Sequence, residues 1–288
     1  MSDSPPLIEV RNLRKEFRAP AGGRVAAVED VSFSIAAGEA FGLAGLSGSG
    51  KSTVGRVIMN LSRPTAGEVL FEGRPISGRR GGSLLDVRSR MQMVFQNPLA
   101  SMNPRRTARS IIEMPLKCYA IGNSAERKDR VYDLLNLVGL SPRHAEYYPH
   151  EFSGGQCQRL GIARALATNP KFIFLDEPVS ALDVSIQAQI LNLLKDLQEK
   201  LNLTYLFVAN NLSVEGFIAD RLAIMSAGRI VEMGPTRDIF RAPRHQMTRD
   251  LLASILSLDV ENANADQGRR GSSPEPARVS ASVGRPST

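Results

Sequence analysis

One segment organises the chain: Gly45-Leu46-Ser47-Gly48-Ser49-Gly50-Lys51-Ser52. It follows a short apolar run at residues 40–44, which is typical of a buried strand. It precedes residues 53–61, whose apolar side chains recur at helical spacing. A strand, a glycine-rich loop and a helix in this order are the context in which the pattern G-x-x-x-x-G-K-S/T indicates a phosphate-binding loop.

The chemistry of such a loop is local. Its glycines allow successive backbone N–H groups to turn toward one anion, and the start of the following helix adds a partial positive charge. Lys51 then reaches the outer phosphates, and the hydroxyl group of Ser52 can ligate Mg²⁺. We therefore expect a bound nucleoside triphosphate, held by Gly45, Ser47, Gly48, Ser49, Gly50, Lys51, Ser52 and Thr53.

Composition is that of an ordinary globular protein, with 42% hydrophobic and 23% charged residues among 288. No apolar run approaches the roughly 18–20 residues that a membrane span needs, and residues 1–6 lack the pattern of a signal peptide. Two cysteines, Cys118 and Cys157, support neither a disulfide framework nor a cysteine metal site, which fits a reducing cytoplasm.

The formal net charge of +7 comes from basic residues that are scattered along the sequence, so we expect no nucleic-acid partner. A solvated surface is the interpretation that the scatter favours. A weak attraction to anionic lipid headgroups is the alternative.

The order of predicted elements indicates an α/β fold with a mostly parallel sheet. Before and just after the glycine loop, residues 7–10, 31–35 and 69–71 are expected to form an antiparallel β layer, and Phe17 precedes a loop rich in Pro and Gly. After it, apolar runs at 91–95, 172–175 and 203–209 are typical of buried strands, and a hairpin is expected over 222–233. Residues 97–167 have a helical pattern, and residues 186–201 form a further amphipathic helix.

Two adjacent carboxylates, Asp176 and Glu177, end the apolar run at 172–175. Ligand sites of open parallel sheets form at the carboxyl ends of their strands. One carboxylate there can hold Mg²⁺, and its neighbour can orient or deprotonate an attacking water. An acidic turn after a strand is common in isolation, but next to a phosphate loop we interpret the pair as functional.

A second candidate anion site lies at Ser153-Gly154-Gly155-Gln156, at the start of a helical run. Taken alone, such a motif is usually only a turn. A second phosphate-binding helix start in one domain is redundant unless it serves a nucleotide held by another subunit.

These residues resemble the ATP-binding subunits of ABC transporters, and the resemblance spans residues 7 to about 258. In chain order, the matching positions are Phe17 (adenine stacking), Gly45 to Ser52 (Walker A), Gln96 (Q-loop), Ser153 to Gln156 (signature), Asp176 and Glu177 (Walker B), and Asp183 (D-loop). The resemblance implies a P-loop ABC ATPase core with an inserted helical subdomain. It also implies that Ser52, Gln96 and Asp176 surround Mg²⁺, that Asp183 helps to bind ATP, and that Glu177 activates water.

The resemblance implies domain limits too: an ABC ATP-binding domain over residues 1–258, with the helical subdomain at about 97–167 and a C-terminal family extension at about 234–258. Residues 259–288 are expected to be a disordered tail, because Ala, Ser, Gly, Pro and Arg dominate the end of the chain.

Three longer stretches, at residues 93–98, 148–156 and 176–189, look like oligopeptide/dipeptide importers, and most like the second of their two ATPase subunits. This implies a head-to-tail dimer with a homologous ATPase subunit, two transmembrane permease subunits and, indirectly, a periplasmic binding protein. The chain would then lie on the cytoplasmic face of the bacterial inner membrane. Peptides are favoured by resemblance alone, since relatives carry nickel complexes, opines or glutathione.

One departure concerns the switch position, where Asn210-Asn211 replace the histidine and aspartate of the family. An asparagine amide can hydrogen-bond a phosphate, but it cannot become a cation or relay a proton. We therefore expect slow hydrolysis at this chain's own site. Leu46 also replaces a common glutamate, and Cys157 replaces an arginine, which we interpret as a small packing residue.

These features leave two rivals to an ordinary transport ATPase. The first is an ATP-binding regulatory half of an asymmetric dimer, favoured by Asn210 and opposed by the retained Glu177. The second is a soluble ABC protein of repair or translation. Such proteins usually carry a second ATPase domain, a long coiled coil or zinc cysteines, and this sequence has none of these.

Overall fold

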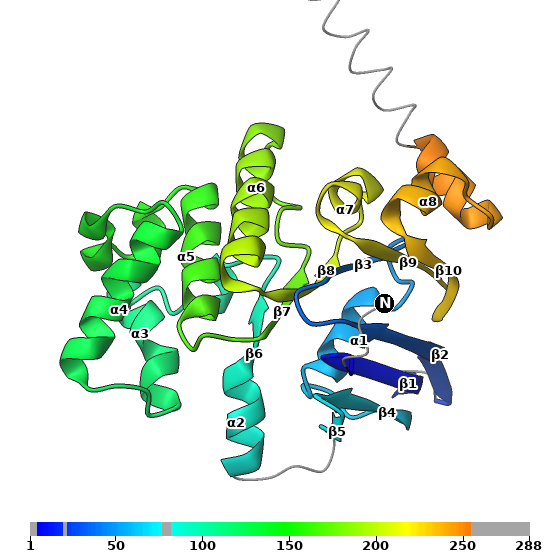
Figure 1. Cartoon of the computed structure of the whole chain (residues 1–288), viewed down its shortest axis with the longest axis horizontal. Helices are drawn as coiled ribbons and strands as arrows, with labels where there is room; N and C mark the ends of the chain where they lie inside the picture. The colour runs from blue at the N-terminus through cyan, green and yellow to red at the C-terminus, as the bar shows by residue number, and fades with distance from the viewer. Residues whose placement is uncertain (1–4, 20–21, 77–81, 255–288) are drawn as a thin grey trace, which may run out of the picture.

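The computed structural model describes residues 5–19, 22–76 and 82–254. Within these ranges, ten strands join in one sheet of order β5-β4-β1-β2-β10-β9-β3-β8-β7-β6. Helices lie against this sheet, and a group of them forms a separate lobe at one end of the molecule (Figure 1). The predicted tail at 259–288 lies outside the described residues.

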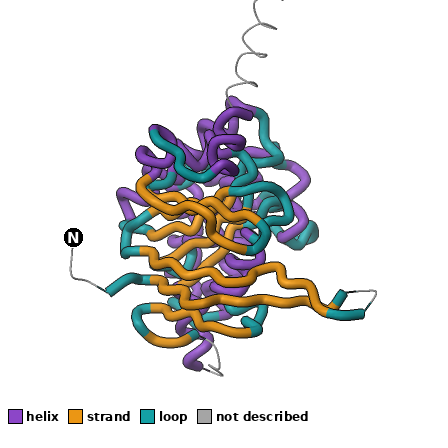
Figure 2. Tube along the Cα trace, turned by 90° about the vertical axis from the view of Figure 1, so that its right-hand side faces the viewer, coloured by secondary structure: helices purple, strands orange, loops and turns teal. Residues whose placement is uncertain are grey.

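The antiparallel part of the sheet consists of β1 (Ile8–Arg18), β2 (Arg24–Ile35), β4 (Ala66–Phe71) and β5 (Arg74–Pro75). β1 pairs with β2 on one side and with β4 on the other. The ends of β1 and β2 project from the body as a long hairpin (Figure 2). The first strand is therefore longer than the sequence indicated, and Phe17 lies within β1, opposite Val25, rather than between two strands.

The parallel part consists of β3 (Ala40–Ala44), β8 (Thr204–Val208), β7 (Phe172–Asp176) and β6 (Met91–Val94). Every residue of β3, β7 and β8 is buried, which explains why these strands are mostly apolar; Asp176 at the end of β7 and Thr204 at the start of β8 are the polar exceptions. β9 (Arg221–Ser226) pairs parallel with β3, and β10 (Arg229–Pro235) returns antiparallel to β9. The predicted mostly parallel sheet with an antiparallel layer is confirmed.

Apolar periodicity in the sequence is strong for some helices and weak for others. The helices are α1 (Lys51–Ile58), α2 (Gly82–Arg90), α3 (Ala108–Cys118), α4 (Ser124–Leu137), α5 (Gly154–Leu166), α6 (Val184–Leu201), α7 (Leu212–Ile218) and α8 (Thr236–Arg241), and residues 246–254 are also helical. The sequence did not indicate α2, α7 or α8. α2 buries only Val87, so it carries almost no apolar periodicity. No helix among the described residues is long and apolar enough to cross a membrane.

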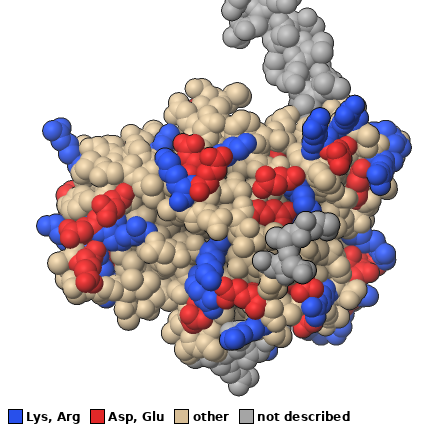
Figure 3. Space-filling view, in the orientation of Figure 1, with Lys and Arg blue, Asp and Glu red and all other residues tan. Residues whose placement is uncertain are grey.

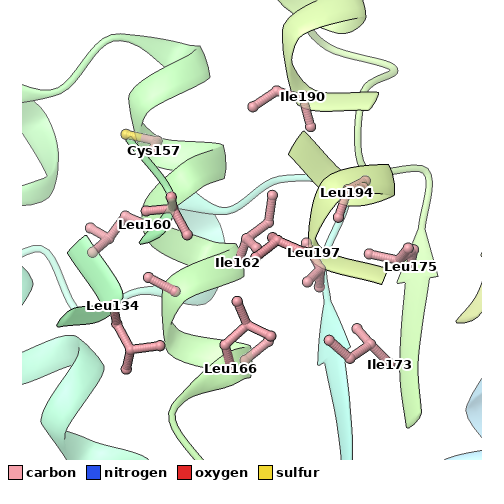
Figure 4. Packing of buried hydrophobic residues seen from close by; sticks show 14 of the residues in the cluster. Leu134, Cys157, Leu160, Ile162, Leu166, Ile173, Leu175, Ile190, Leu194 and Leu197 are labelled. Carbon is pink, nitrogen blue, oxygen red and sulfur yellow. The ribbon is translucent and has the colours of Figure 1, made fainter. Parts of the chain in front are cut away.

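Helices α3, α4 and α5 form the lobe at one end, as the helical pattern predicted (Figure 1). The short 3₁₀ turn η1 (Leu99–Ser101) precedes α3, and η2 (Pro142–Glu146) and η3 (Pro149–Glu151) lie between α4 and α5. One buried cluster joins this lobe to the sheet. Leu160 and Leu166 of α5, Leu194 of α6 and Ile173 of β7 belong to it (Figure 4). Cys157 is fully buried in the same cluster, as expected for a packing residue. The start of α5 is thus held in a fixed relation to the end of β7.

Charges on the face seen in Figure 3 are mixed: basic side chains lie beside acidic ones and form no continuous basic stripe. The ion pairs of the described residues include Lys171 with Glu72 at 2.6 Å and Arg90 with Asp86 at 2.6 Å. On this face the arrangement is that of a solvated surface.

Candidate functional site: a phosphate loop and a carboxylate pair

The loop between β3 and α1 has a backbone that requires glycine at two positions. Gly45 has φ of +144° and Gly50 has φ of +106°. A Cβ atom on Gly45 would lie 2.2 Å from the carbonyl oxygen of Met225, and one on Gly50 would lie 2.3 Å from that of Ala27. The loop is therefore pressed against β9 and β2, and its conformation leaves no space for a side chain at these points.

Lys51 begins α1 and is buried. Its Nζ donates to the carbonyl oxygens of Gly45, at 2.7 Å, and Leu46, at 3.0 Å. Because both acceptors are neutral, these contacts do not neutralise the ammonium charge. Burial lowers the pKa of Lys51 below its ordinary value, against the opposing influence of nearby carboxylates, of which Glu215 is the strongest. The loop thus holds a desolvated cation.

Ser52 and Asp176 meet across the sheet edge. Ser52 Oγ donates to Asp176 Oδ1 at 2.7 Å, and Arg56 lies 4.0 Å from the other carboxylate oxygen. Hydroxyl and carboxylate oxygens are ligands that Mg²⁺ prefers. The described residues contain no group of three or more His, Cys, Asp or Glu side chains suited to a metal ion.

Glu177, which follows β7, is held between two amide groups. Gln96 Nε2 donates to its Oε2 at 2.8 Å, and Asn210 Nδ2 donates to its Oε1 at 2.7 Å. Gln96 follows β6 and Asn210 follows β8, the two strands that flank β7 in the sheet. The backbone of Glu177 has φ of +50°, which is uncommon outside glycine and is often found at functional sites.

Among the described residues, Gln96 makes no hydrogen bond to the other two predicted metal ligands, Ser52 and Asp176. The structure brings Ser52 and Asp176 together, whereas the Gln96 amide is engaged with Glu177 and, at 3.3 Å, with Ser180. The predicted role of Gln96 at the metal stays a prediction.

The predicted signature motif is a helix start that caps itself. Ser153 is the N-cap residue of α5; its Oγ accepts the N–H of Gln156 at 3.3 Å, and Gln156 Oε1 accepts the N–H of Ser153 at 3.0 Å. Gly155 is needed here, because a Cβ atom would lie 2.6 Å from Ile186 of α6. Cys157 Sγ lies 3.5 Å from the carbonyl oxygen of Pro149 and steadies the preceding turn.

No hydrogen bond or ion pair in the described part of the chain links Ser153, Gly154, Gly155 or Gln156 to the phosphate loop. Helices α5 and α1 lie in different parts of the molecule (Figure 1). Gly154 of this motif instead lines a cavity of about 230 Å³, whose walls also include Gln96 and Leu182.

Two further predicted residues lie outside the loop. Asp183 caps α6, and its Oδ1 accepts the N–H of Ile186 at 3.0 Å. Phe17 is 48% exposed near the end of the β1–β2 hairpin, with Lys15 Nζ 5.0 Å from its ring centre. An exposed aromatic face of this kind is suited to stacking on a base.

Sequence reasoning missed Glu215. This carboxylate is fully buried in α7, and Lys51 is the cation whose charge acts on it. Its position was readable: Glu215 lies three residues after Leu212 and three before Ile218, on the buried face of the helix. The apolar pattern of the sequence did not reveal it, because a charged residue does not contribute to apolar periodicity.

Comparisons with known proteins agree with this geometry. The family model described as "ABC transporter" matches residues 28–180. The oligopeptide transport ATP-binding protein OppF of Bacillus subtilis is 50% identical over 257 residues, covering 88% of this chain and 84% of OppF. The dipeptide transport ATP-binding protein DppF of Lactococcus lactis is 48% identical over 262 residues, covering 90% of this chain and 84% of DppF.

Among solved structures, the dimeric ATP-binding cassette MJ0796, in a post-hydrolysis state bound to ADP and Pi, is 32% identical to this chain. It superposes with a TM-score of 0.72 over 80% of this chain and 99% of the cassette. The fold, the phosphate loop and these matches lead to one conclusion. The chain belongs to the ABC transporter family and is an ATP-hydrolysing cassette of that family.

Proposed function

We propose that this chain is the ATP-binding and ATP-hydrolysing subunit that energises the import of oligopeptides or dipeptides across the bacterial inner membrane. The peptide assignment is supported by the similarity to OppF and DppF, which extends over 88–90% of this chain. The hydrolytic assignment is supported above all by one observation: a carboxylate, Glu177, follows the strand that also carries Asp176 beside the phosphate loop.

In this proposal the residues of the loop hold ATP. The residues present fit a triphosphate, because three positions of the turn (Gly45, Gly48 and Gly50) carry no side chain and the hydrogen bonds that Lys51 makes among the described residues go to neutral carbonyl oxygens. Ser52 and Asp176 would hold Mg²⁺, which when bound supplies positive charge to the phosphate oxygens. Gln96 would add its side-chain oxygen to this set, and Thr53 would add a hydroxyl group to the phosphate site.

Glu177 would then orient the attacking water. Its two oxygens accept from Gln96 and Asn210, and each keeps a second lone pair that can accept a hydrogen bond from a water. The carboxylate would act as general base over a hydrogen-bond distance. Asn210 would donate its amide to the outer phosphate.

The partner assignments follow from the same family. MJ0796 is dimeric in its ADP- and Pi-bound structure, and we propose a head-to-tail dimer for this chain as well. Ser153, Gly154, Gly155 and Gln156 would then contact a nucleotide held by the homologous ATPase subunit, as would Asp183, while Phe17 would stack on the adenine of this chain's own ATP. Two permease subunits would anchor the pair to the cytoplasmic face of the membrane, with a periplasmic binding protein delivering the substrate.

A second candidate function is favoured by Asn210. Its amide donates to Glu177 and carries no proton that it can pass on as an acid. In this alternative the chain binds ATP as the regulatory, catalytically weak half of an asymmetric dimer, and the opposite site performs most of the hydrolysis.

The experiment that separates these functions is Mg-ATP turnover by the purified chain, compared with Asn210→His and Glu177→Gln, with ATP binding measured separately. An ordinary transport ATPase turns over at least about 100-fold faster than Glu177→Gln, the range of a lost general base. The regulatory half binds ATP, turns over no faster than Glu177→Gln, and gains activity in Asn210→His.

The peptide assignment has its own test. A bacterial strain without this chain should lose uptake of labelled di- and oligopeptides while retaining uptake of free amino acids. Unchanged peptide uptake, with loss of uptake of a nickel complex, an opine or glutathione, would overturn that assignment.

A further inference from the structure

Glu215 is a fully buried carboxyl group that the proposed chemistry does not use. It lies in the middle of α7, between the buried residues Val214 and Ile218, and its side chain has no exposed surface. An ionised carboxylate is costly to bury unless it is paired. A carboxyl group retained at such a position therefore calls for a specific contact that an apolar residue does not provide.

That contact is with Ala209, in the segment of Ala209, Asn210 and Asn211 that joins β8 to α7; we call it the switch segment. One carboxyl oxygen, Oε1, accepts the backbone N–H of Ala209 at 2.9 Å, and this bond is itself buried. Ala209 directly precedes Asn210, whose Nδ2 donates to Glu177 Oε1 at 2.7 Å. The backbone of Glu215 also donates to the carbonyl oxygen of Asn211 at 3.4 Å. The turn from β8 to α7 is thus tied to Glu215 on both sides of Asn210.

The second oxygen, Oε2, is buried and has no hydrogen-bond partner among the described residues. Burial raises the pKa of Glu215 well above its ordinary value; the N–H of Ala209 and the charge of Lys51 oppose this shift only in part. Lys51 of α1 is the charged group that acts on Glu215. The carboxylates Asp176 and Glu177 act in turn on Lys51.

We propose that Glu215 is a positioning residue whose buried carboxyl group fixes the peptide between Ala209 and Asn210 and thereby presents the Asn210 amide to Glu177. The inference rests on the proposed role of Asn210 at the hydrolytic site. It goes beyond that role, because it explains why an asparagine, with a short side chain and no charge, is held at a defined place.

Two substitutions separate positioning from simple space filling. Glu215→Gln keeps an oxygen that accepts the N–H of Ala209. Glu215→Met fills a similar volume without a strong acceptor. Ile218→Val, on the same buried face of α7, is the matched control for a small loss of packing that leaves Ala209 untouched.

The first measurement is hydrogen exchange at the amide of Ala209 in the full chain, which needs no catalytic activity. We expect exchange at least about tenfold faster in Glu215→Met than in the native chain, since a buried hydrogen bond is lost. We expect no more than about a threefold change in Glu215→Gln or Ile218→Val. Equal exchange in Glu215→Met and the native chain would overturn the proposal.

The second measurement is a double-mutant cycle on Mg-ATP turnover with Asn210→Ala. Glu215→Met should lower kcat about tenfold in the native background, with KM for ATP changed less than about threefold, and should have little further effect beside Asn210→Ala. Equal losses in both backgrounds would show that Glu215 does not act through Asn210.

The exchange measurement does not depend on the proposed function, whereas the turnover cycle does. If the chain binds ATP without hydrolysing it, the hydrolytic function is wrong, and exchange at Ala209 still decides whether Glu215 holds the switch segment. If Glu215→Gln is as damaging as Glu215→Met in both assays, the acceptor role is wrong, whatever the chain transports.

Discussion

Helices α1 and α5 both begin at a turn rich in glycine and serine, yet their first turns are completed in different ways. α1 starts at Gly50 with no side-chain cap and no acidic residue in its first turn. α5 starts at Ser153, and Ser153 and Gln156 cap each other. The first helix start is open to an external anion, whereas the second is already partly satisfied within the chain.

A third helix start makes the comparison sharper. At the beginning of the helix at residues 246–254, Glu232 of β10 accepts the N–H groups of Arg244, at 2.8 Å, and His245, at 3.0 Å, and the hydroxyl group of Thr248, at 2.5 Å. At this helix start the anion is a side chain of the protein itself, the carboxylate of Glu232. The three starts show that similar local elements differ in how many of their donors the fold leaves free.

The largest effect should come from Gly50→Ala, a substitution at the N-cap position of α1, where the helix has no side-chain cap. The new Cβ atom would meet the carbonyl oxygen of Ala27 at 2.3 Å. We expect a loss of ATP affinity of at least about 100-fold, or roughly 2.8 kcal/mol, measured by titration calorimetry, with circular dichroism to verify folding.

Gly48→Ala is the matched control for that substitution. Gly48 also has a positive φ, of +79°, but a Cβ atom there has open space around it. Its loss of affinity should stay within about tenfold, which corresponds to the backbone strain alone. Equal losses in the two variants would show that backbone strain, rather than the closed space at Gly50, controls binding.

A smaller effect is expected where the chain supplies its own anion. Glu232→Gln removes the charge that three donors share at the start of the last helix, and we expect a loss of about 1.5–3 kcal/mol of local stability, as for hydrogen bonds to charged groups. Limited proteolysis and hydrogen exchange over residues 242–254 measure it. Exchange in α1 should not change.

The pH dependence of this contact has a definite sign. Burial raises the pKa of Glu232, but the hydroxyl group of Thr248 and the N–H groups of Arg244 and His245 outweigh it, so the pKa lies below its ordinary value of 4.5. The contribution to stability is therefore full above pH 4.5 and is lost as the pH falls through the lowered value. The difference between the native chain and Glu232→Gln should shrink in that acidic window and stay constant near neutrality. A difference that grows toward low pH would contradict the assignment.

The smallest effect should come from the helix start that caps itself. Ser153→Ala removes one side-chain cap of α5 and should cost about 1 kcal/mol of unfolding free energy, measured by urea denaturation. Ser153→Thr, which retains the hydroxyl group, should lose less than half of this. ATP affinity of the isolated chain should be unchanged in both variants, and a loss of affinity would mean that the α5 start serves this chain's own nucleotide.

Much of the fold could be read from the sequence because its strands are buried on both faces. β3, β7 and β8 each contain at least four consecutive residues without a charged or hydroxyl-bearing aliphatic side chain, and α6 has a regular apolar face. The short helices α2 and α8 could not be read, since each of them buries only one or two residues. α7 buries four of its seven residues, but one of these is Glu215, whose charge interrupts the apolar pattern. The extension of β1 to Arg18 was missed for a related reason: its outer half is exposed and pairs mainly through its backbone.

The sequence by itself determined the phosphate loop at Gly45 to Ser52 and the acidic pair Asp176 and Glu177, because these depend on residues adjacent along the chain. Only the tertiary structure decided that Gln96 and Asn210, which are 81 and 33 residues from Glu177, both hold its carboxylate. It also decided that Glu215 lies behind this site, bound to the N–H of Ala209. The physical reason is that periodicity records which face of an element is buried, whereas contacts between distant side chains depend on the order in which strands join the sheet.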